Sequence, residues 1–156
     1  STPLRAEFEA VRSRVLTEAV RRDSLREEVR SMRERMRREL SKAREGEFDL
    51  KQGAGGIADI EFLAQYWTLR EAAKQPIVLM FSDTIRQLET LASGDLVPQH
   101  TVDQLTSAYR AYRARSHHRS LREEGIVIAD SEFVAEREGV CRIWAETFRD
   151  GPGCGV

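Results

Sequence analysis

The chain has 156 residues, enough for one domain to bury a hydrophobic core without disulfides or metal ions. Charged residues make up 33% of the chain, but 25 basic and 26 acidic residues nearly cancel, for a net charge of −1. Because general nucleic-acid and membrane binders need a surplus of positive charge, this balance disfavours both kinds of partner.

Cysteine usage and hydropathy favour a reducing compartment. The two cysteines, Cys141 and Cys154, have neither the spacing of a metal site nor that of a redox pair. We expect no signal peptide and no membrane span, since no apolar run approaches the roughly 18 residues that a span needs. We therefore expect a cytoplasmic protein.

Two amphipathic helices are predicted before residue 46. Thr2 and Pro3 are favourable residues at a helix start, and apolar side chains then recur at helical spacing through Val15. A capping-box signature at residues 24–27 opens the second helix, which Gly46 is expected to end. Its apolar residues form one stripe, so we expect it on the outside of a bundle. The stripe consists of Leu25, Val29, Met32, Met36 and Leu40.

The remaining surface of the second helix is rich in arginine and glutamate. Arg30, Arg33 and Arg37 are candidate residues for contact with a phosphate or for docking a partner protein. A solvated charged face is the more common reason for such a run, so both interpretations stay open.

A glycine loop at residues 46–56 is the most unusual stretch of the chain. Glycines in such a loop allow tight turns or a close approach of backbone or ligand, and a glycine pair before a helix exposes N–H groups that can receive an anion. A tight turn with no ligand is the simpler explanation, and it also stays open. The candidate residues for a nucleotide cleft are Lys51, Gln52, Gly53, Gly55 and Gly56.

The helix that follows, residues 57–69, is the most apolar of the chain. Its apolar residues cover more than one face, which predicts a position at the centre of the bundle. Asp59 and Glu61 lie on its first turn, where carboxylates suit the helix dipole. We interpret both as structural carboxylates that hold the helix start or an arginine of a neighbouring helix.

Three further helices are predicted downstream. Ser82 or Asp83 caps the first of them, and Gly94 ends it. The second follows Pro98 and ends at Gly125, and the third begins near residues 130–131. The β-branched residues 126–128 lack an obvious partner strand, so we expect a packed loop there.

The pattern predicts an all-α bundle of five to six helices over residues 1–150, followed by a disordered tail, 151–156. The sequence shows no nucleotide-binding P-loop, no Ser-His-Asp set and no metal motif. His117 and His118 are neighbours on a helix and point about 100° apart, so they are not expected to share one metal ion. We therefore predict no catalytic and no metal-binding residue in this chain.

The segment at residues 48–65 resembles the pattern FDLKxxxGGIxDIEF of glutamine synthetase adenylyltransferases. The resemblance extends over nearly the whole chain. It includes segments 25–29, 32–37, 82–86 and 136–138 and the pair His117-His118. The family has two tandem halves, each with a nucleotidyltransferase domain followed by a helical domain. Lys51 and Asp59 resemble the C-terminal half, which adenylylates glutamine synthetase, and the helical domain of PII uridylyltransferase is the nearest alternative.

The resemblance implies that the catalytic domain, with its ATP and Mg²⁺ sites, is absent from this chain. Asp59 and Glu61 after Gly55 and Gly56 imitate the metal-binding pattern of that domain, but the gap is too short and the carboxylates lie on a helix. The expected partners are the preceding nucleotidyltransferase domain, glutamine synthetase and the PII signal protein.

Two function classes remain open from the sequence. In the first, the domain supports the catalytic domain, and Lys51 with the glycine loop lines the ATP cleft. In the second, the domain is an interaction module that docks glutamine synthetase or PII through Arg30, Arg33 and Arg37, and the loop is purely structural.

Overall fold

The computed structural model describes residues 22–72, 74, 82–122 and 125–149, together with residues 3, 5–7, 9 and 10. Within these ranges the chain forms five long helices and two short strands. The predicted first helix lies largely outside the described residues, and the predicted tail lies wholly outside them. The elements are α2 (Arg22–Leu40), β1 (Glu47–Asp49), α3 (Ile57–Ala72), α4 (Thr84–Ser93), α5 (Gln99–Leu121), β2 (Val127–Ala129) and α6 (Val134–Phe148).

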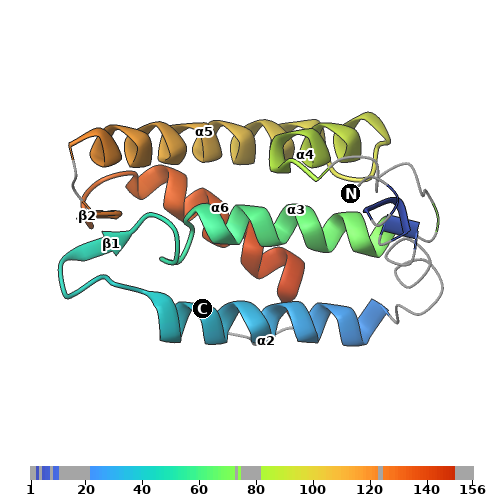
Figure 1. The fold of residues 1–156 in the computed structure, drawn as a ribbon, viewed down its shortest axis with the longest axis horizontal. Coiled ribbons are helices and arrows are strands. Elements are labelled where there is room, and N and C mark those ends of the chain that lie inside the picture. Colours follow the sequence, from blue (N-terminus) through green and yellow to red (C-terminus); the bar gives the residue numbers. More distant parts are fainter. Residues whose placement is uncertain are drawn as a thin grey trace.

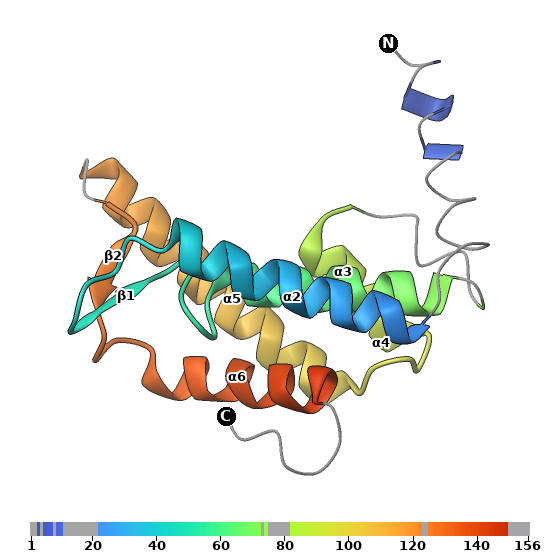
Figure 2. The same ribbon diagram turned by 90° about the horizontal axis from the view of Figure 1, so that it is seen from below.

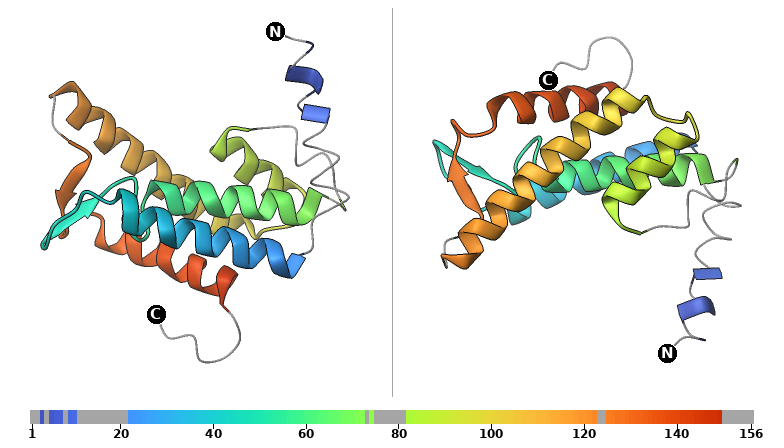
Figure 3. Two further views of the ribbon diagram at one scale, coloured as in Figure 1. Left: turned by 60° about the horizontal axis from the view of Figure 1, so that its bottom comes forward. Right: turned by 90° about the horizontal axis from the view of Figure 1, so that it is seen from above.

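Helix α3 is the centre of the bundle (Figure 1). It contacts α2, α4, α5 and α6, whereas α2 contacts only α3 and α6 among the described elements. Figure 3 shows α2 running alongside α3 in one view and α5 crossing it in the other. The predicted all-α bundle and the central position of the helix after the glycine loop are therefore confirmed.

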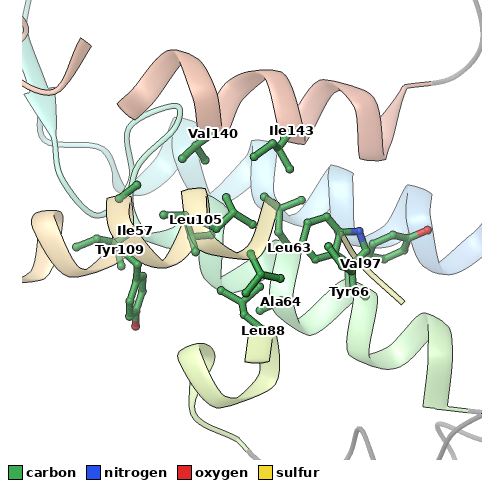
Figure 4. Close-up of a cluster of buried hydrophobic side chains, with 14 of the residues drawn as sticks. Ile57, Leu63, Ala64, Tyr66, Leu88, Val97, Leu105, Tyr109, Val140 and Ile143 are labelled. Atoms are coloured by element: carbon green, nitrogen blue, oxygen red, sulfur yellow. The ribbon is translucent and has the colours of Figure 1, made fainter. Parts of the chain in front are cut away.

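The core lies where α3 meets α4, α5 and α6 (Figure 4). Leu63, Leu88, Leu105 and Val140, one from each of these helices, are fully buried. Burying such a side chain stabilises the fold by about 1.5–3 kcal/mol relative to leaving it exposed. This packing fixes the first turn of α3 beside α5. No described helix has the length and apolar character that crossing a bilayer requires.

Helix α2 buries the predicted face in its first half but not in its second half. Leu25 and Val29 pack against the core as expected. Met32 and Leu40, however, are about half exposed, while Arg33 is fully buried. Positions 25, 29 and 33 follow one another at a spacing of four and share one face of the helix. A charged side chain therefore occupies the place that the apolar stripe was expected to fill.

A short antiparallel sheet closes one end of the bundle (Figure 1). Phe48 of β1 pairs with Ile128 of β2, and both side chains are buried. The prediction of a packed loop at residues 126–128 is therefore wrong. Its partner strand, Glu47–Asp49, is short and has a carboxylate at each end, so it does not show the apolar alternation that indicates a strand.

The observed helix ends agree with the predictions at α4 and differ from them at α2 and α6. Helix α2 begins at Arg22 rather than at Ser24, and it ends at Leu40 rather than near Gly46. Beyond Leu40, Lys42 N–H donates to the carboxylate of Asp49 at 3.0 Å instead of continuing the helix. Helix α4 is as predicted, because Asp83 caps it by accepting a hydrogen bond from Arg86 N–H at 3.1 Å and the helix ends before Gly94. Helix α6 starts only at Val134, since Phe133 has a left-handed backbone with φ of 55°.

Candidate functional site

The glycine loop is shaped by the buried carboxylate of Asp49. Its Oδ1 accepts hydrogen bonds from the N–H groups of Lys51 at 2.9 Å and Gln52 at 2.8 Å. Its Oδ2 accepts the bond from Lys42 that ties the end of α2 to the loop. Aspartate commonly forms turns by bonding N–H groups two or three residues further on, and this was the signal that the sequence analysis missed.

The N–H groups that we expected to face an anion are already bonded within the chain. Ile57 N–H, at the start of α3, donates to Leu50 O at 2.9 Å, and Gly55 N–H donates to Asp59 Oδ2 at 2.8 Å. The other bonds join Gly53 N–H to Asp49 O, Gly56 N–H to Gly53 O, and Ala58 N–H to Lys51 O. The predicted set of free donors at this helix start is therefore wrong, because the loop folds back and satisfies them.

The glycines of the loop are needed for its folding. Gly55 has φ of 80°, and a Cβ atom there would lie 2.5 Å from the carbonyl oxygen of Arg137. At Gly56 a Cβ atom would lie 2.6 Å from Leu50 O. Both positions therefore require close backbone packing that only glycine allows.

Asp59 is the centre of a charged network between α2 and α3. Arg33 Nε donates to its Oδ1 at 2.7 Å, and Arg37 Nη2 donates to the same oxygen at 3.0 Å. Arg33 also donates to the side-chain and backbone oxygens of Gln52, at 3.1 and 2.8 Å. Burial lowers the pKa of Arg33, and the charge of Asp59 opposes that shift. Because Gly55 N–H bonds the same carboxylate, the network fastens the glycine loop to α2.

The three arginines proposed for docking have different surroundings. Arg33 is 0% exposed, so its assignment as a docking residue is wrong, because Asp59 needs a buried counter-charge. The side chain of Arg37 keeps 31% of its surface exposed while it bonds Asp59. Arg30 pairs with Glu27 at 2.7 Å and is partly exposed. Only Arg30 and Arg37 are therefore accessible to a partner.

The two carboxylates on the first turn of α3 each hold a basic side chain. Glu61 pairs with Lys51 Nζ, and Asp59 holds the two arginines. This arrangement does not fit a magnesium site, since Mg²⁺ needs carboxylate oxygens that are free to coordinate it. Nor do the described residues contain a cluster of three or more His, Cys, Asp or Glu side chains that could hold a metal ion.

A hollow of about 260 Å³ opens between α2 and α6, which lie near each other in Figure 2. Arg30 and Arg37 line one side of it, and Trp144 and Phe148 line the other. Arg149 also borders it, together with Glu34. We name this the α2–α6 hollow. It combines two aromatic rings in contact, with centroids 4.2 Å apart and planes tilted by 37°, with basic groups at its rim.

A second hollow, of about 340 Å³, lies between the glycine loop and α5. Lys51 borders it from the loop, and Arg113 and His117 border it from the helix. Arg113 was not among the residues singled out from the sequence, and His117 was considered only in a metal pair with His118 that was not expected to form. Their spacing of four residues on α5, which places them on one face, could have indicated a shared surface. We name this the loop–α5 hollow.

Comparison with known proteins identifies relatives over most of the chain. Residues 23–125 match the family model described as GlnD PII-uridylyltransferase. The chain is 40% identical over 144 residues to the bifunctional glutamine synthetase adenylyltransferase/adenylyl-removing enzyme of Thioalkalivibrio sulfidiphilus. It is 42% identical over 141 residues to the enzyme of that name from Methylococcus capsulatus, and 43% identical over 155 residues to that from Pseudomonas aeruginosa.

These matches cover 90–92% of this chain but only 15–16% of each relative. The chain therefore spans less than a fifth of the length of these relatives. The resemblance drawn from the glycine-loop motif is confirmed by the two comparisons.

Proposed function

The chain belongs to the family described as GlnD PII-uridylyltransferase, and on this premise we propose that it is the helical domain of a glutamine synthetase adenylyltransferase. The observation that carries the proposal is its identity of 40–43% with three bifunctional enzymes of that name. In the whole enzyme, a preceding nucleotidyltransferase domain would bind ATP and Mg²⁺, and this domain would support it. Glutamine synthetase would be the substrate and the PII protein a regulator, in the cytoplasm.

Within that enzyme we assign the chain to the C-terminal, adenylylating half. The assignment rests on the loop that opens with Asp49, Leu50 and Lys51 and on the presence of Asp59 at the start of α3. The corresponding domain of a PII uridylyltransferase is the nearest alternative, and the family match supports it equally. Transfer of AMP to glutamine synthetase by the full-length protein would separate the two, since a uridylyltransferase would modify PII instead.

The proposed role of the glycine loop is to present Lys51 to the nucleotide cleft of the catalytic domain. Asp49 and Asp59 hold the loop backbone from two sides, so the position of Lys51 is set by hydrogen bonds to two buried carboxylates. The side chain itself is 42% exposed and reaches the loop–α5 hollow. Glu61 keeps the ammonium group in place until an anion competes for it. The loop would thus supply one point charge and no backbone donors.

Kinetics of the full-length enzyme with Lys51→Ala test this role. We expect kcat/KM for ATP to fall about 5- to 150-fold, the equivalent of about 1–3 kcal/mol for a lost charge-assisted hydrogen bond, with the melting temperature nearly unchanged. Lys42→Ala is the matched control, because Lys42 is an exposed lysine before the same loop.

A second variant separates a nucleotide contact from a merely structural ion pair. Glu61→Gln removes the partner of Lys51 but leaves the ammonium group in place. If Lys51 acts on the nucleotide, Glu61→Gln keeps most of the activity that Lys51→Ala loses. Equal losses in the two variants, or unchanged kinetics in Lys51→Ala, would assign the loop a structural role only.

A second candidate function is docking of a partner protein at the α2–α6 hollow. The observation in its favour is the position of Arg30 and Arg37 opposite Trp144 and Phe148, since arginine and tryptophan are enriched at the energetic centres of interfaces. Under this alternative the partner is glutamine synthetase or PII, and the glycine loop serves only the fold.

Charge reversal on α2 tests the docking alternative. Arg30→Glu changes the rim of the hollow without touching the bonds of Asp59, whereas Arg37→Glu would disturb them. Arg35→Glu is the matched control, because it is exposed on the same helix and does not line the hollow. Docking predicts at least tenfold weaker binding of glutamine synthetase or PII by Arg30→Glu alone. Equal effects of the two variants would exclude docking at this site.

A further inference from the structure

The loop–α5 hollow has an unusual excess of basic and donor groups. Two hydroxyl residues of α5, Ser116 and Ser120, line it together with the three basic residues Lys51, Arg113 and His117. Its remaining lining is the apolar pair Ile57 and Ile126. Ile57 lies at the first turn of α3, beside α5 (Figure 4). No carboxylate contributes to the lining.

The charge of the hollow is only partly neutralised by the described residues. Lys51 is paired with Glu61. Arg113 donates to the Tyr109 hydroxyl at 3.2 Å and lies over its ring at 5.5 Å, but it forms no ion pair with any carboxylate that the structure describes. That hydrogen bond also raises the pKa of Arg113. The guanidinium group therefore remains a cation with donors to spare.

The lining groups on α5 follow one face of the helix. Successive lining positions on α5 are three, one and three residues further along, which places them within two turns on the same side of the helix. They are Arg113, Ser116, His117 and Ser120. Two turns of helix span roughly 10 Å. Donors spread over this length match an extended anion with several charged groups better than one small ion. A volume of about 340 Å³ is also near the lower end of the range for small-ligand sites.

We propose that the loop–α5 hollow binds a polyphosphate group, with Arg113 and His117 as ligand-binding residues beside Lys51. Arg113 would bind phosphate oxygens through its planar fork, and Lys51 would contribute a point charge. The serine hydroxyl groups and the imidazole N–H of His117 would donate to the remaining oxygens. The inference rests on the proposed function in that the polyphosphate of ATP, or released pyrophosphate, is the natural source of such a group.

Titration of this 156-residue chain with sodium pyrophosphate, followed by the ring signals of its histidines in NMR spectra, tests the site directly. The chain has three histidines, and His100 serves as the internal reference. His100 lies at the opposite end of α5, roughly 25 Å away along the helix, and His118 is adjacent but does not line the hollow. We expect a saturable shift of the His117 signal, a smaller one of His118 and none of His100.

Matched variants on α5 show which residues bind. Arg113→Ala is expected to weaken pyrophosphate binding at least fivefold, whereas Arg110→Ala, an exposed arginine outside the hollow, leaves it within twofold. Sulfate at equal ionic strength should bind much more weakly than pyrophosphate, because it offers one anionic group instead of two. Equal effects of the two arginine variants, or no saturable shift of His117, would overturn the proposal.

Titrations with ATP, pyrophosphate and adenosine distinguish binding of the nucleotide from binding of the released product. They also separate this proposal from the proposed role of Lys51 in the full-length enzyme. ATP that binds like pyrophosphate, with no effect of adenosine, supports recognition of the nucleotide through its phosphates. Pyrophosphate that binds while ATP does not supports a site for the released product. Shifts with adenosine alone would contradict a polyphosphate site. If Lys51→Ala impairs the full-length enzyme but this chain does not bind pyrophosphate, the proposed function stands and only the polyphosphate site in the loop–α5 hollow is rejected.

Discussion

Arg33 and Asp59 form an ion pair of 2.7 Å in which the two side chains are 0% and 1% exposed. They lie 26 residues apart, on α2 and α3, and their hydrogen bonds reach the glycine loop at Gln52 and Gly55. The pair therefore joins an outer helix, the central helix and the loop in one buried network. Buried pairs of this kind contribute little when intact but are costly to break, because the remaining charge has no partner.

Asp59→Asn should destabilise this chain by about 3–5 kcal/mol, because Arg33 then stays buried as a cation without an anion. Glu61→Gln, which breaks the more exposed pair with Lys51, should change the free energy of unfolding by less than about 1 kcal/mol. Urea unfolding of the two variants and of the unchanged chain measures both effects. Similar losses in the two variants would contradict the central role of the buried pair.

Helix positions were predictable from the sequence, but the interior face of α2 was not. Periodicity and caps located α3, α4 and α5, since apolar spacing and residues such as Asp83 act locally. The spacing of Leu25 and Val29 also points to position 33, yet an arginine there reads as a surface residue unless its partner is known. That partner, Asp59, is on α3, so the burial of Arg33 depends on an ion pair between two helices and not on the apolar spacing within α2.

The residues of the candidate site were likewise predictable where they are continuous in the sequence, but their contacts were not. Lys51 and the glycines were recognisable because the motif is continuous in sequence. The hydrogen bonds that occupy the loop N–H groups depend on how the loop folds back, and the arrival of Arg113 and His117 depends on the packing of α5 against the start of α3. The contacts with α5 join residues more than fifty positions apart, which no local pattern encodes.

Gly55→Ala should destabilise the chain more than Gly46→Ala, although both glycines have a positive φ, of 80° and 78°. A left-handed backbone alone costs an alanine about 1–2 kcal/mol. At Gly46 nothing lies within 4 Å of the added Cβ, so only this cost applies. At Gly55 the Cβ would also lie 2.5 Å from Arg137 O, so a further loss is expected. Urea unfolding midpoints at equal m-values compare the two, and equal losses would contradict close packing of the loop on α6.

Cys141 should react slowly with iodoacetamide at pH 8 in the folded chain and quickly in urea. Burial raises the pKa of its thiol, so the reactive thiolate is rarer than in the unfolded chain. The same shift makes the unfolded state the stronger acid. The contribution of the Cys141 thiol to the free energy of unfolding is therefore fully present at a pH below the pKa of the unfolded thiol. It is lost as the pH rises through the pKa of the folded thiol. Mass spectrometry of the peptide containing Cys141 follows the reaction, and equal rates in the two states would contradict the partial burial of this thiol.

This chain by itself should transfer no AMP from ATP to glutamine synthetase. The transfer needs carboxylates that hold Mg²⁺ against the phosphates, and the two best placed here, Asp59 and Glu61, are engaged by basic side chains. Incubation of the pure chain with ATP, Mg²⁺ and glutamine synthetase, followed by mass spectrometry of the synthetase, measures the transfer. The full-length enzyme is the positive control. AMP transfer by this chain that disappears in Glu61→Gln would show that this carboxylate leaves Lys51 to bind the metal, and the assignment of catalysis to a separate domain would then be wrong.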